Sequence, residues 1–418
     1  MKSGISRLGA GTGGRLLATV AIVGAVLSPA PARADAVSDW NKIALGAAAG
    51  NPFTQARIVA ITQLAVFEAV NAITGDYEPY LGTVAAAPGA SAEAAAIAAA
   101  YAVLKNYFPA NATLDGLRAD ALAAIPDGAA KDDGIAAGVA AAGAMIALRT
   151  GDGALPPPAG IEPAGPANPG VWQRTPSCPA GGGVFAQWSD VQPFGIPSAS
   201  DFLLPPPPAL TSNRYAKDLD EVKRVGGKTS MERPLDRADV ASVYATVSPS
   251  GVFSSFAAQL SAVRGDSLSQ NARNLALINM AISDALVASF MNKYYYDFWR
   301  PETAIRAADP NTTFEPYIAT PCFPSYPSNH ASGSGAGAEM VRRLYGAGGH
   351  ALTIENPAVP GVVLHYSELK QATNDIDDAR VFGGIHFRFD QEAGGHLARD
   401  VATYVYKHNL RAVHDQQQ

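Results

Sequence analysis

Basic residues and strand signals are scarce in this chain of 418 residues. Lysine and arginine together number 31 against 37 aspartates and glutamates, so the formal net charge is −6. A surface of that sign argues against nucleic acid or an anionic membrane as a partner. Alternating β-branched runs joined by Asn-Gly or Asp-Gly turns are almost absent from residues 35–150. Residues 35–150 are therefore predicted to be helical, within a chain that reads as a globular protein.

Cysteine is also scarce, because only Cys178 and Cys322 occur. A chain of this length buries a large core without cross-links. In an exported protein the pair is compatible with one disulfide, and two free thiols are the alternative, since sequence does not give the Cα separation. If joined, the two cysteines tie a proline-rich middle segment to a loop that precedes the second motif described below.

The first 34 residues have the pattern of a secretory signal peptide. A basic start is followed by an apolar stretch and a small-residue cleavage site before Asp35: Lys2, Arg7, Arg15, Leu16 to Leu27 and Ala32-Arg33-Ala34. The apolar stretch is about a dozen residues long, too short to span a bilayer. We therefore expect cleavage after Ala34 and a secreted or periplasmic protein, whose net charge falls from −6 to −10 when the four basic residues of the signal are removed.

The rest of the chain divides by composition into regions 35–150, 151–212 and 213–418. The first is Ala-rich, with helices expected at 39–49, 54–73, 91–107, 114–125 and 131–149, the fourth capped by Asn111 or Thr113. The second has proline runs but also Trp172, Trp188 and Phe194, which predicts an ordered excursion over a helical body and not a flexible linker. In the third region, helices are expected at 215–225 and at 269–298, the latter capped by Ser267, and another helix is expected to begin near residue 239.

One stretch, residues 272–291, is apolar enough to raise the question of a membrane span. Arg273, Asn274, Asn279 and Asp284 interrupt it. A buried helix of a bundle is therefore the prediction, with no integral membrane segment after residue 34.

Three short segments in the last third of the chain carry residues suited to chemistry. They are Lys293-Tyr-Tyr-Tyr-Asp-Phe-Trp-Arg300-Pro301, Pro327-Ser328-Asn329-His330 and Arg380-Val-Phe-Gly-Gly-Ile-His386. The segments supply three cations and two histidines, and no cage of carboxylates or cysteines accompanies them. That composition suits a pocket for a tetrahedral oxyanion with acid/base chemistry on it, since guanidinium forks match such oxygens bidentately.

In the first segment Lys293 and Arg300 are seven residues apart, so on one helix they share a face about 10 Å apart along the axis. Pro301 disfavours helical geometry at Arg300, so the helix is expected to end there, with Lys293 reaching along a groove and Arg300 at its mouth. Two solvated surface cations are the alternative. The helix around them is apolar and aromatic, however, and cations in such a setting need a counter-ion.

The second segment passes from a proline-stiffened loop into a run of small residues, 331–338. Ser328 is the expected cap, which would expose the backbone N–H groups of Asn329 and His330 at a helix N-terminus, a ready anion site. The small residues let another helix approach closely. Taken alone, His330 fits a hydrogen-bonded structural histidine as well as a catalytic one.

In the third segment Gly383-Gly384 predicts a turn that folds His386 back toward Arg380. Asp390 follows His386 by four residues, so on a helix it can accept the proton of one ring nitrogen and orient the other. A helix N-terminal charge, or a partner for Arg388, is the alternative. His386 would then be the nucleophile or axial ligand, and His330 the general acid/base.

In this order, Lys-x6-Arg-Pro, Pro-Ser-x-His and Arg-x5-His resemble the tripartite signature of vanadium-dependent haloperoxidases and type 2 phosphatidic-acid-phosphatase (PAP2) acid phosphatases. Gln55-Ala-Arg-Ile-Val-Ala-Ile-Thr, Ala65-Val-Phe-Glu-Ala-Val-Asn-Ala and Gly384-Ile-His-Phe-Arg-Phe-Asp are similar to exported bacterial members grouped with the haloperoxidases. The resemblance covers most of the chain after residue 34. It implies an all-α fold of helical bundles with the site buried at the end of one bundle.

The resemblance also implies roles for the residues. Equatorial oxygens of vanadate or phosphate would be bound by five groups: Lys293, Arg300, Ser328, the backbone N–H of Asn329, and Arg380. His386 would bond to vanadium or attack phosphorus, and His330 would protonate the apical oxygen, peroxide or leaving group. Phe323 matches an aromatic position on the halide side of some haloperoxidases, and a core aromatic is the alternative.

Two positions depart from the family pattern, since Asn329 stands where glycine is usual and Ala379 where serine is usual. Asparagine keeps the N–H and tolerates unusual backbone angles, so anion binding can survive. The leading hypothesis is a secreted haloperoxidase that uses vanadate, hydrogen peroxide, a halide and a small organic acceptor. The alternatives are a secreted acid phosphatase acting on a phosphomonoester through a phosphohistidine, and a non-catalytic phosphate- or vanadate-binding homologue. The sequence does not give the oligomeric state.

Overall fold

The computed structural model describes residues 4–7, 35–155, 160, 168–179 and 182–413, and these are mainly helical. The helices are α1 (Ala36–Ala47), α2 (Pro52–Thr74), α3 (Ala92–Tyr107), α4 (Thr113–Ala123), α5 (Ala129–Arg149), α6 (Asn213–Val225), α7 (Leu235–Val243), α8 (Pro249–Arg264), α9 (Leu268–Tyr296), α10 (Pro301–Ala308), α11 (Asn329–Tyr345), α12 (Leu369–Phe382) and α13 (Arg388–His408). The predicted helical class is confirmed, and each helix expected from the sequence is present within a few residues of its predicted bounds.

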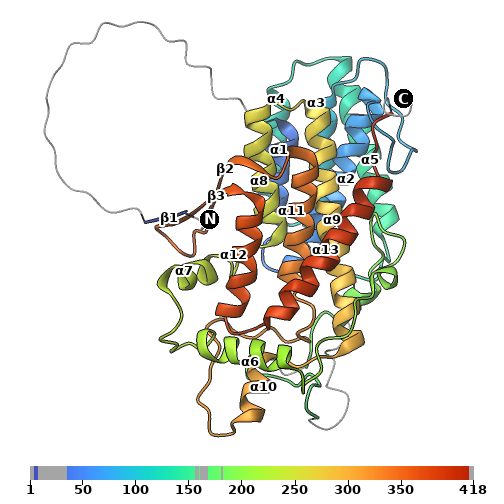
Figure 1. The fold of residues 1–418 in the computed structure, drawn as a ribbon. Coiled ribbons are helices and arrows are strands. Elements are labelled where there is room, and N and C mark those ends of the chain that lie inside the picture. Colours follow the sequence, from blue (N-terminus) through green and yellow to red (C-terminus); the bar gives the residue numbers. More distant parts are fainter. Residues whose placement is uncertain (1–3, 8–34, 156–159, 161–167, 180–181, 414–418) are drawn as a thin grey trace, which may run out of the picture.

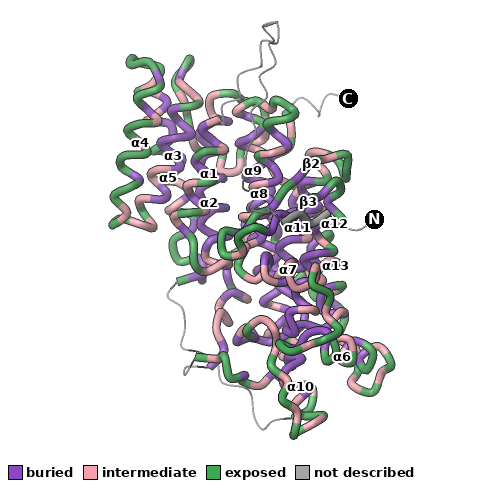
Figure 2. The backbone as a smooth tube through the Cα atoms, turned by 90° about the vertical axis from the view of Figure 1, so that its left-hand side faces the viewer, coloured by how far each residue is buried: buried purple, intermediate pink, exposed green. Residues whose placement is uncertain are grey.

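The helices form two packed groups, α1 to α5 in one and α8, α9, α11, α12 and α13 in the other, which meet where α2 packs on α9. Figure 1 gives the place of each helix. Seen from the side, α3, α4 and α5 lie at one edge, α11 to α13 lie toward the other, and α2 and α9 lie between (Figure 2). Helices α2 and α9 are long and apolar enough to cross a membrane by length and composition alone, but 89% and 94% of their most apolar windows are buried in protein. They are therefore the central helices of the core.

Helix α11 packs closely on its neighbours because its first half consists of small residues. A Cβ atom added to Gly335 would lie 2.7 Å from Cβ of Ala398 on α13, and one added to Gly394 would lie 2.7 Å from the carbonyl oxygen of Ser328. The close helix approach predicted for residues 331–338 is thus confirmed. It brings the start of α13 against the start of α11, where the second and third motifs lie.

Two predicted helix boundaries were wrong. The N-cap of α4 is Ala112, which has no side-chain cap hydrogen bond, and Asn111 instead accepts from the N–H of Thr113. Helix α9 ends at Tyr296 and not near Arg300, because Asp297 adopts a left-handed conformation with φ 47°. Helix α8 was not predicted, although Ser248 caps it and Pro249 occupies its first position.

A small antiparallel sheet was not predicted. Strand β3 (Val362–Glu368) lies between β2 (Gly348–Glu355) and β1 (Gly4–Arg7). Leu364 and Tyr366 are buried and their neighbour His365 is exposed, the period-two alternation of a strand with one covered face. Residues 8–34, which hold most of the predicted signal peptide, lie outside the described residues.

The proline-rich excursion is ordered where the structure describes it. Trp172, Trp188 and Phe194 are buried, and short 3₁₀ helices occur at Ala186–Asp190 and Ala199–Phe202. The N–H groups of Phe194, Gly195 and Ile196 all donate to the buried carboxylate of Asp284 on α9. The prediction of an excursion packed over the helical body is confirmed for these residues.

Cys178 and Cys322 form a disulfide across 144 residues of sequence. It joins the excursion to the loop between α10 and α11, as the sequence analysis expected of a bridged pair. Of the two readings left open, the disulfide is the one the structure supports.

Candidate active site

Lys293 lies in the last turn of α9 and is 0% exposed. Its ammonium donates to the backbone carbonyls of Pro324 at 2.9 Å and Ser325 at 2.7 Å, and to that of Pro327. Three acceptors occupy all three donors of a lysine ammonium. Carbonyl groups are dipoles, so they orient the charge of Lys293 without neutralising it.

Arg300 is also 0% exposed, which contradicts its predicted place at the mouth of a groove. It does not share a helix face with Lys293, because the chain is extended at Arg300, the N-cap residue before α10. Its Nε donates to the carbonyl of Phe323 at 2.8 Å, and Nη1 lies 2.9 Å from both the carbonyl of Ile385 and Nε2 of His386. The turn at Asp297 thus carries the guanidinium into the core.

Arg380 lies in the last turn of α12 and is 3% exposed. Its Nη1 donates to the carbonyl of Tyr244 at 3.1 Å. Within the described residues, Nε of Arg380 and Nη2 of Arg300 are buried donors without a partner. An unpaired buried donor of a charged group is costly, so these two donors are available to an anion.

The second motif is placed as predicted at the start of α11. Ser328 is the N-cap, and its hydroxyl accepts from the N–H of Ala331 at 3.4 Å. The side chain of Asn329 is buried and its Oδ1 accepts from the hydroxyl of Ser289 at 2.7 Å. The asparagine that replaces the usual glycine is therefore anchored on α9, and its backbone N–H remains in the first turn of α11. His330 follows and is half-buried.

His386 and Asp390 form the predicted hydrogen bond, with Nδ1 and Oδ2 2.8 Å apart. Gly383 and Gly384 make the predicted turn, with Gly384 at φ 80°. Nε2 of His386 faces the Nη1–H of Arg300, which only donates, so Nε2 is an acceptor and Nδ1 carries the proton. His386 therefore presents an Nε2 lone pair beside Arg300. Asp390 also lies in the first turn of α13, as one alternative expected, but it does not bond to Arg388, which pairs with Glu221 and Asp378.

Ser325 was missed by the sequence reading. Its hydroxyl donates to Oδ2 of Asp390 at 2.6 Å, and the N–H of Phe387 donates to the same oxygen at 3.1 Å. Together with His386 these groups fix the carboxylate. Its position in Pro324-Ser325-Tyr326-Pro327, a short stiff loop just before the second motif, was the available signal.

Phe323 packs on the cations. The ring centroid lies 4.9 Å from Cζ of Arg300 and 5.3 Å from Nζ of Lys293, both within cation–π range. The ring also contacts Phe290 and Phe53, with centroids 5.3 and 6.0 Å away. Phe323 is therefore both a core aromatic and one wall of the group formed by Lys293, Arg300 and Arg380, here called the cation cluster.

The protonation states follow from burial and from like charges. Burial lowers the pKa of Arg300 to about 9 and that of Arg380 to about 10, so both stay charged at neutral pH. Burial, and then the charge of Arg300, holds the pKa of Lys293 well below its ordinary value. The pKa values of His330 and His386 are also well below their ordinary range, first through burial and then through the nearby cations. Both histidines are therefore neutral.

A tetrahedral oxyanion fits this arrangement. Three cations lie within electrostatic reach of one another and of both histidines, and Asp390 is the carboxylate that acts on Lys293 and Arg300. Burial raises the pKa of Asp390 to about 6. One carboxylate does not balance three cations. No cluster of three or more histidines, cysteines or carboxylates suited to a metal cation is present in the described ranges. The donor set thus matches an anion.

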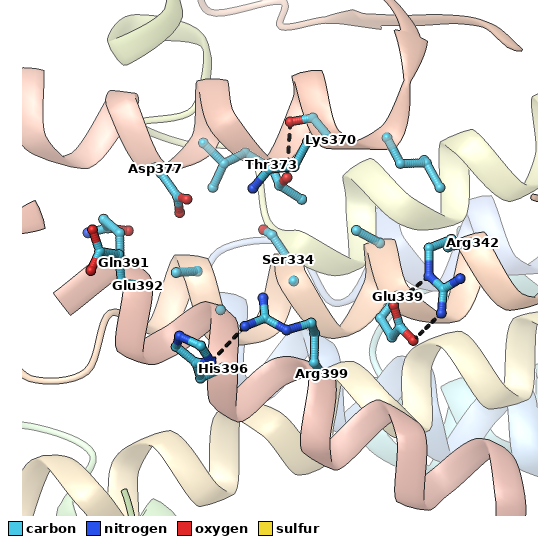
Figure 3. A pocket seen from close by; sticks show the side chains of 16 residues that line it. Ser334, Glu339, Arg342, Lys370, Thr373, Asp377, Gln391, Glu392, His396 and Arg399 are labelled. Carbon is cyan, nitrogen blue, oxygen red and sulfur yellow. Dashed lines mark hydrogen bonds and ion pairs between the residues drawn. The ribbon is translucent and has the colours of Figure 1, made fainter. Parts of the chain in front are cut away.

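A separate cavity of about 400 Å³ lies among α11, α12 and α13 (Figure 3). None of the predicted anion-binding or catalytic residues lines it. Four of its polar side chains already form two pairs, Glu339 with Arg342 and His396 with Arg399. His396 thus lies in this separate cavity and not among the predicted site residues.

A comparison with family models matches residues 273–415 to the VCPO second helical-bundle domain. All three motifs lie in that range. Among curated proteins, the vanadium chloroperoxidase of Curvularia inaequalis is 28% identical over 192 residues, which cover 34% of this chain and 31% of that protein. The match thus spans about a third of the relative's length.

Solved structures match along nearly the whole chain. A bacterial vanadium-dependent iodoperoxidase superposes with a TM-score of 0.77 at 23% identity, covering 90% of this chain and 96% of that one. The holo form of a bacterial vanadium-dependent chloroperoxidase superposes with a TM-score of 0.71 at 18% identity. The match covers 91% of this chain and 94% of that one. The chain therefore has the vanadium haloperoxidase fold, and residues 273–415 match the second helical-bundle domain of that family.

Proposed function

We propose that the protein is a vanadate-dependent haloperoxidase that oxidises a halide with hydrogen peroxide at the buried cation cluster. The observation that carries the proposal is that Lys293, Arg300 and Arg380 are buried together, while two guanidinium donors lack partners in the described structure. The match of residues 273–415 to a vanadium haloperoxidase domain, and the shared fold, support vanadate as the anion. The small organic acceptor would receive the oxidised halogen.

The chain supplies the groups that would hold vanadate. Arg300 Nη2 and Arg380 Nε would donate to its oxygens, as would the hydroxyl of Ser328 and the N–H of Asn329 at the positive end of α11. Lys293 would act mainly through its charge while its donors remain on carbonyls. When bound, vanadate supplies the Lewis-acid activation of hydrogen peroxide.

The two histidines would divide the remaining tasks. His386 would bind the anion through Nε2, because Asp390 holds the proton on Nδ1 and Arg300 lies beside Nε2. His330 is neutral in the free site, so it would take a proton from incoming peroxide and return it to a leaving oxygen. Phe323 would exclude water from one side of the cations.

One assay series tests the proposal. The purified protein is incubated with orthovanadate, hydrogen peroxide, bromide and a halogen-accepting dye, with and without phosphate as competitor. We expect dye halogenation that requires vanadate, falls with phosphate and is lost in His386→Ala, while the control His396→Ala keeps activity. Phosphomonoester hydrolysis that depends on His386, without halogenation, would replace this proposal with the phosphatase. Tight phosphate binding without either activity would leave a non-catalytic binding protein.

We also propose that the protein is exported and cleaved after Ala34. The Cys178–Cys322 disulfide supports this, because disulfides persist in oxidising compartments. Cleavage there removes strand β1 from its edge of the sheet and leaves the β2–β3 pair. N-terminal sequencing of protein recovered from outside the cytoplasm is expected to begin at Asp35. An intact start at Met1 would contradict it.

A further inference from the structure

The loop from residue 320 to residue 327, here called the carbonyl loop, has little regular backbone bonding. Pro321, Pro324 and Pro327 have no N–H to donate. Two of its backbone bonds run from Phe323 to Pro321 at 3.0 Å and from Ser325 to Phe298 at 2.8 Å. Groups outside the loop must therefore fix its path.

The carbonyl loop holds two of the three cations. Its backbone oxygens at Phe323, Pro324, Ser325 and Pro327 accept from Arg300 and Lys293, and the Phe323 ring lies on both charges. The guanidinium of Arg300 bonds the carbonyl of Phe323 through Nε and lies against Nε2 of His386 through Nη1. A displacement of the loop would therefore move both cations relative to His386.

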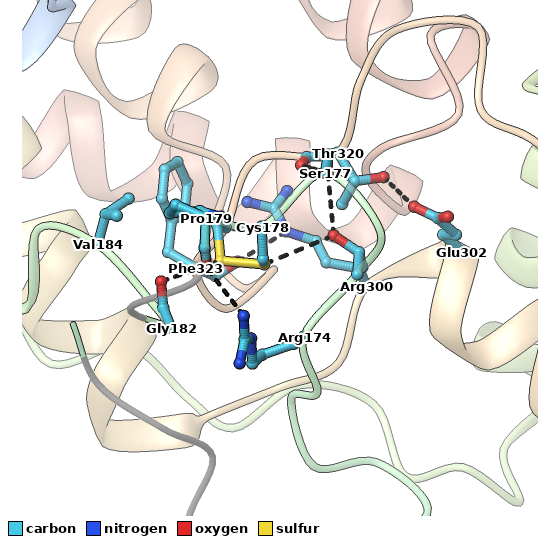
Figure 4. Close-up of a disulfide and its surroundings, with 12 residues drawn as sticks. Arg174, Ser177, Cys178, Pro179, Gly182, Val184, Arg300, Glu302, Thr320 and Phe323 are labelled. Carbon is cyan, nitrogen blue, oxygen red and sulfur yellow. Dashed lines mark hydrogen bonds between the residues drawn. A yellow bond between two sulfur atoms is a disulfide. The ribbon is translucent and has the colours of Figure 1, made fainter.

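The disulfide fixes the start of this loop to the excursion (Figure 4). Cys322 is adjacent to Phe323 in the chain, and the carbonyl of Cys322 accepts from the N–H of Val184 at 2.9 Å. The hydroxyl of Ser177, next to Cys178, donates to the carbonyl of Thr320 at 2.5 Å. The excursion is itself anchored, since the N–H of Trp172 donates to the carbonyl of Asp297 at 2.7 Å.

We propose that the Cys178–Cys322 disulfide is a positioning element of the anion site. It holds the carbonyl loop in the path that aligns Arg300 and Lys293 for an oxyanion, and its reduction weakens oxyanion binding while the protein remains folded. The ligand class is the tetrahedral oxyanion of the proposed function, on which this inference rests. The Arg300 contacts through Phe323 are the route by which the disulfide acts.

The test measures the dissociation constant of inorganic phosphate by calorimetry at 15 °C, well below unfolding, on the full chain. The oxidised wild type is compared with the Cys178→Ser/Cys322→Ser double variant and with wild type reduced by a phosphine. We expect the dissociation constant to rise at least tenfold in both. Circular dichroism of the aromatic region confirms that each sample is folded.

A matched control separates positioning from general loss of stability. Leu104→Ala creates a cavity in α3, in the other helical group, and is expected to lower the melting temperature without touching the loop. Its phosphate affinity should equal that of the wild type. Unchanged affinity in the double variant, despite a lower melting temperature, would show that the disulfide only stabilises the fold and would overturn the inference.

Reciprocity gives a second measurement that needs no variant. If reduction weakens phosphate binding tenfold, saturating phosphate must make the disulfide tenfold harder to reduce at equilibrium. The fraction of free thiol is measured against a dithiol redox buffer with phosphate and with chloride at equal ionic strength. Identical free-thiol curves with phosphate and with chloride would refute the positioning role of the disulfide but would leave the anion pocket standing. A wild type that binds neither phosphate nor vanadate refutes the anion pocket and the proposed function with it.

Discussion

Replacing Arg300 with methionine removes the most connected cation of the site. The change deletes the donors to Phe323, Ile385 and His386 and the unpaired Nη2, and it also relieves repulsion from Lys293 and Arg380. These two effects oppose each other in the anion-free protein. We therefore expect Arg300→Met to change anion binding far more than it changes the stability of the free protein.

The size of the effect follows from linkage. At a phosphate concentration 100 times the dissociation constant, binding raises the unfolding free energy of the wild type by about 2.7 kcal/mol. With about 2.1 cal/mol/K of unfolding entropy per residue, the 418-residue chain has about 0.9 kcal/mol/K, so the melting temperature rises about 3 °C. Loss of charged hydrogen bonds worth about 1.5–3 kcal/mol weakens binding roughly 10- to 100-fold. At the same phosphate concentration the unfolding free energy of the variant rises by only about 0.4–1.4 kcal/mol, and its melting temperature by about 0.5–1.6 °C.

Differential scanning fluorimetry across a phosphate titration measures the shift, and calorimetry gives the affinity. Arg306→Ala is the control, because Arg306 is a partly exposed arginine that pairs with Glu302 on α10. It should show the full wild-type shift. An Arg300→Met protein that also showed the full shift would refute the assignment of the pocket.

Three further outcomes are expected. Asp390→Asn keeps the shape of the side chain but removes the charge that holds Nδ1–H of His386, so the affinity for vanadate should fall roughly 10- to 100-fold. The control is Asp378→Asn, because Asp378 pairs with Arg388 near the surface, and this variant should bind vanadate normally. The lowered pKa of His386 means that below about pH 6.5 the unfolded chain binds one more proton than the folded chain at this residue. Relative to His386→Gln, the wild type should therefore lose about 1.4 kcal/mol of unfolding free energy per unit as pH falls below 6.5, measured by urea unfolding, and equal slopes would contradict the neutral histidine. Gly335→Val should lower the unfolding free energy by about 1–3 kcal/mol, measured by thermal unfolding, because the new side chain clashes with Ala398. The control Gly143→Ala on α5 should not lower it, because no atom lies within 4 Å of a Cβ added there.

Local rules predicted the parts of the site that depend on neighbouring residues. Ser328 caps α11, the Gly383-Gly384 turn returns the chain, and Asp390 reaches His386 across one helical turn. Each of these contacts joins residues at most four positions apart, and spacing along the chain is enough to infer it. The ordered excursion with its buried tryptophans followed from residue type, whereas the state of Cys178 and Cys322 was left open and only the structure shows the disulfide.

Contacts distant in sequence could not be predicted. Pro301 signals both the end of one helix and the start of another, and the sequence did not show which one Arg300 belongs to. The carbonyl acceptors of Lys293 and Arg300 carry no signature, because any residue has a carbonyl group. The sheet was missed although residues 362–364 are apolar and include two β-branched valines, since the partner strand begins with the two glycines Gly348 and Gly349.

The acceptors of Arg300 and Arg380 lie 23, 85 and 136 residues away from them in the sequence, at Phe323, Ile385 and Tyr244. No isolated helix or hairpin can therefore hold these cations. The geometry for the anion arises only after the most distant segments have closed on one another, which is the slow part of assembling such a chain. Phosphate added during refolding would consequently bind only fully assembled molecules, and its uptake would report the last step of folding.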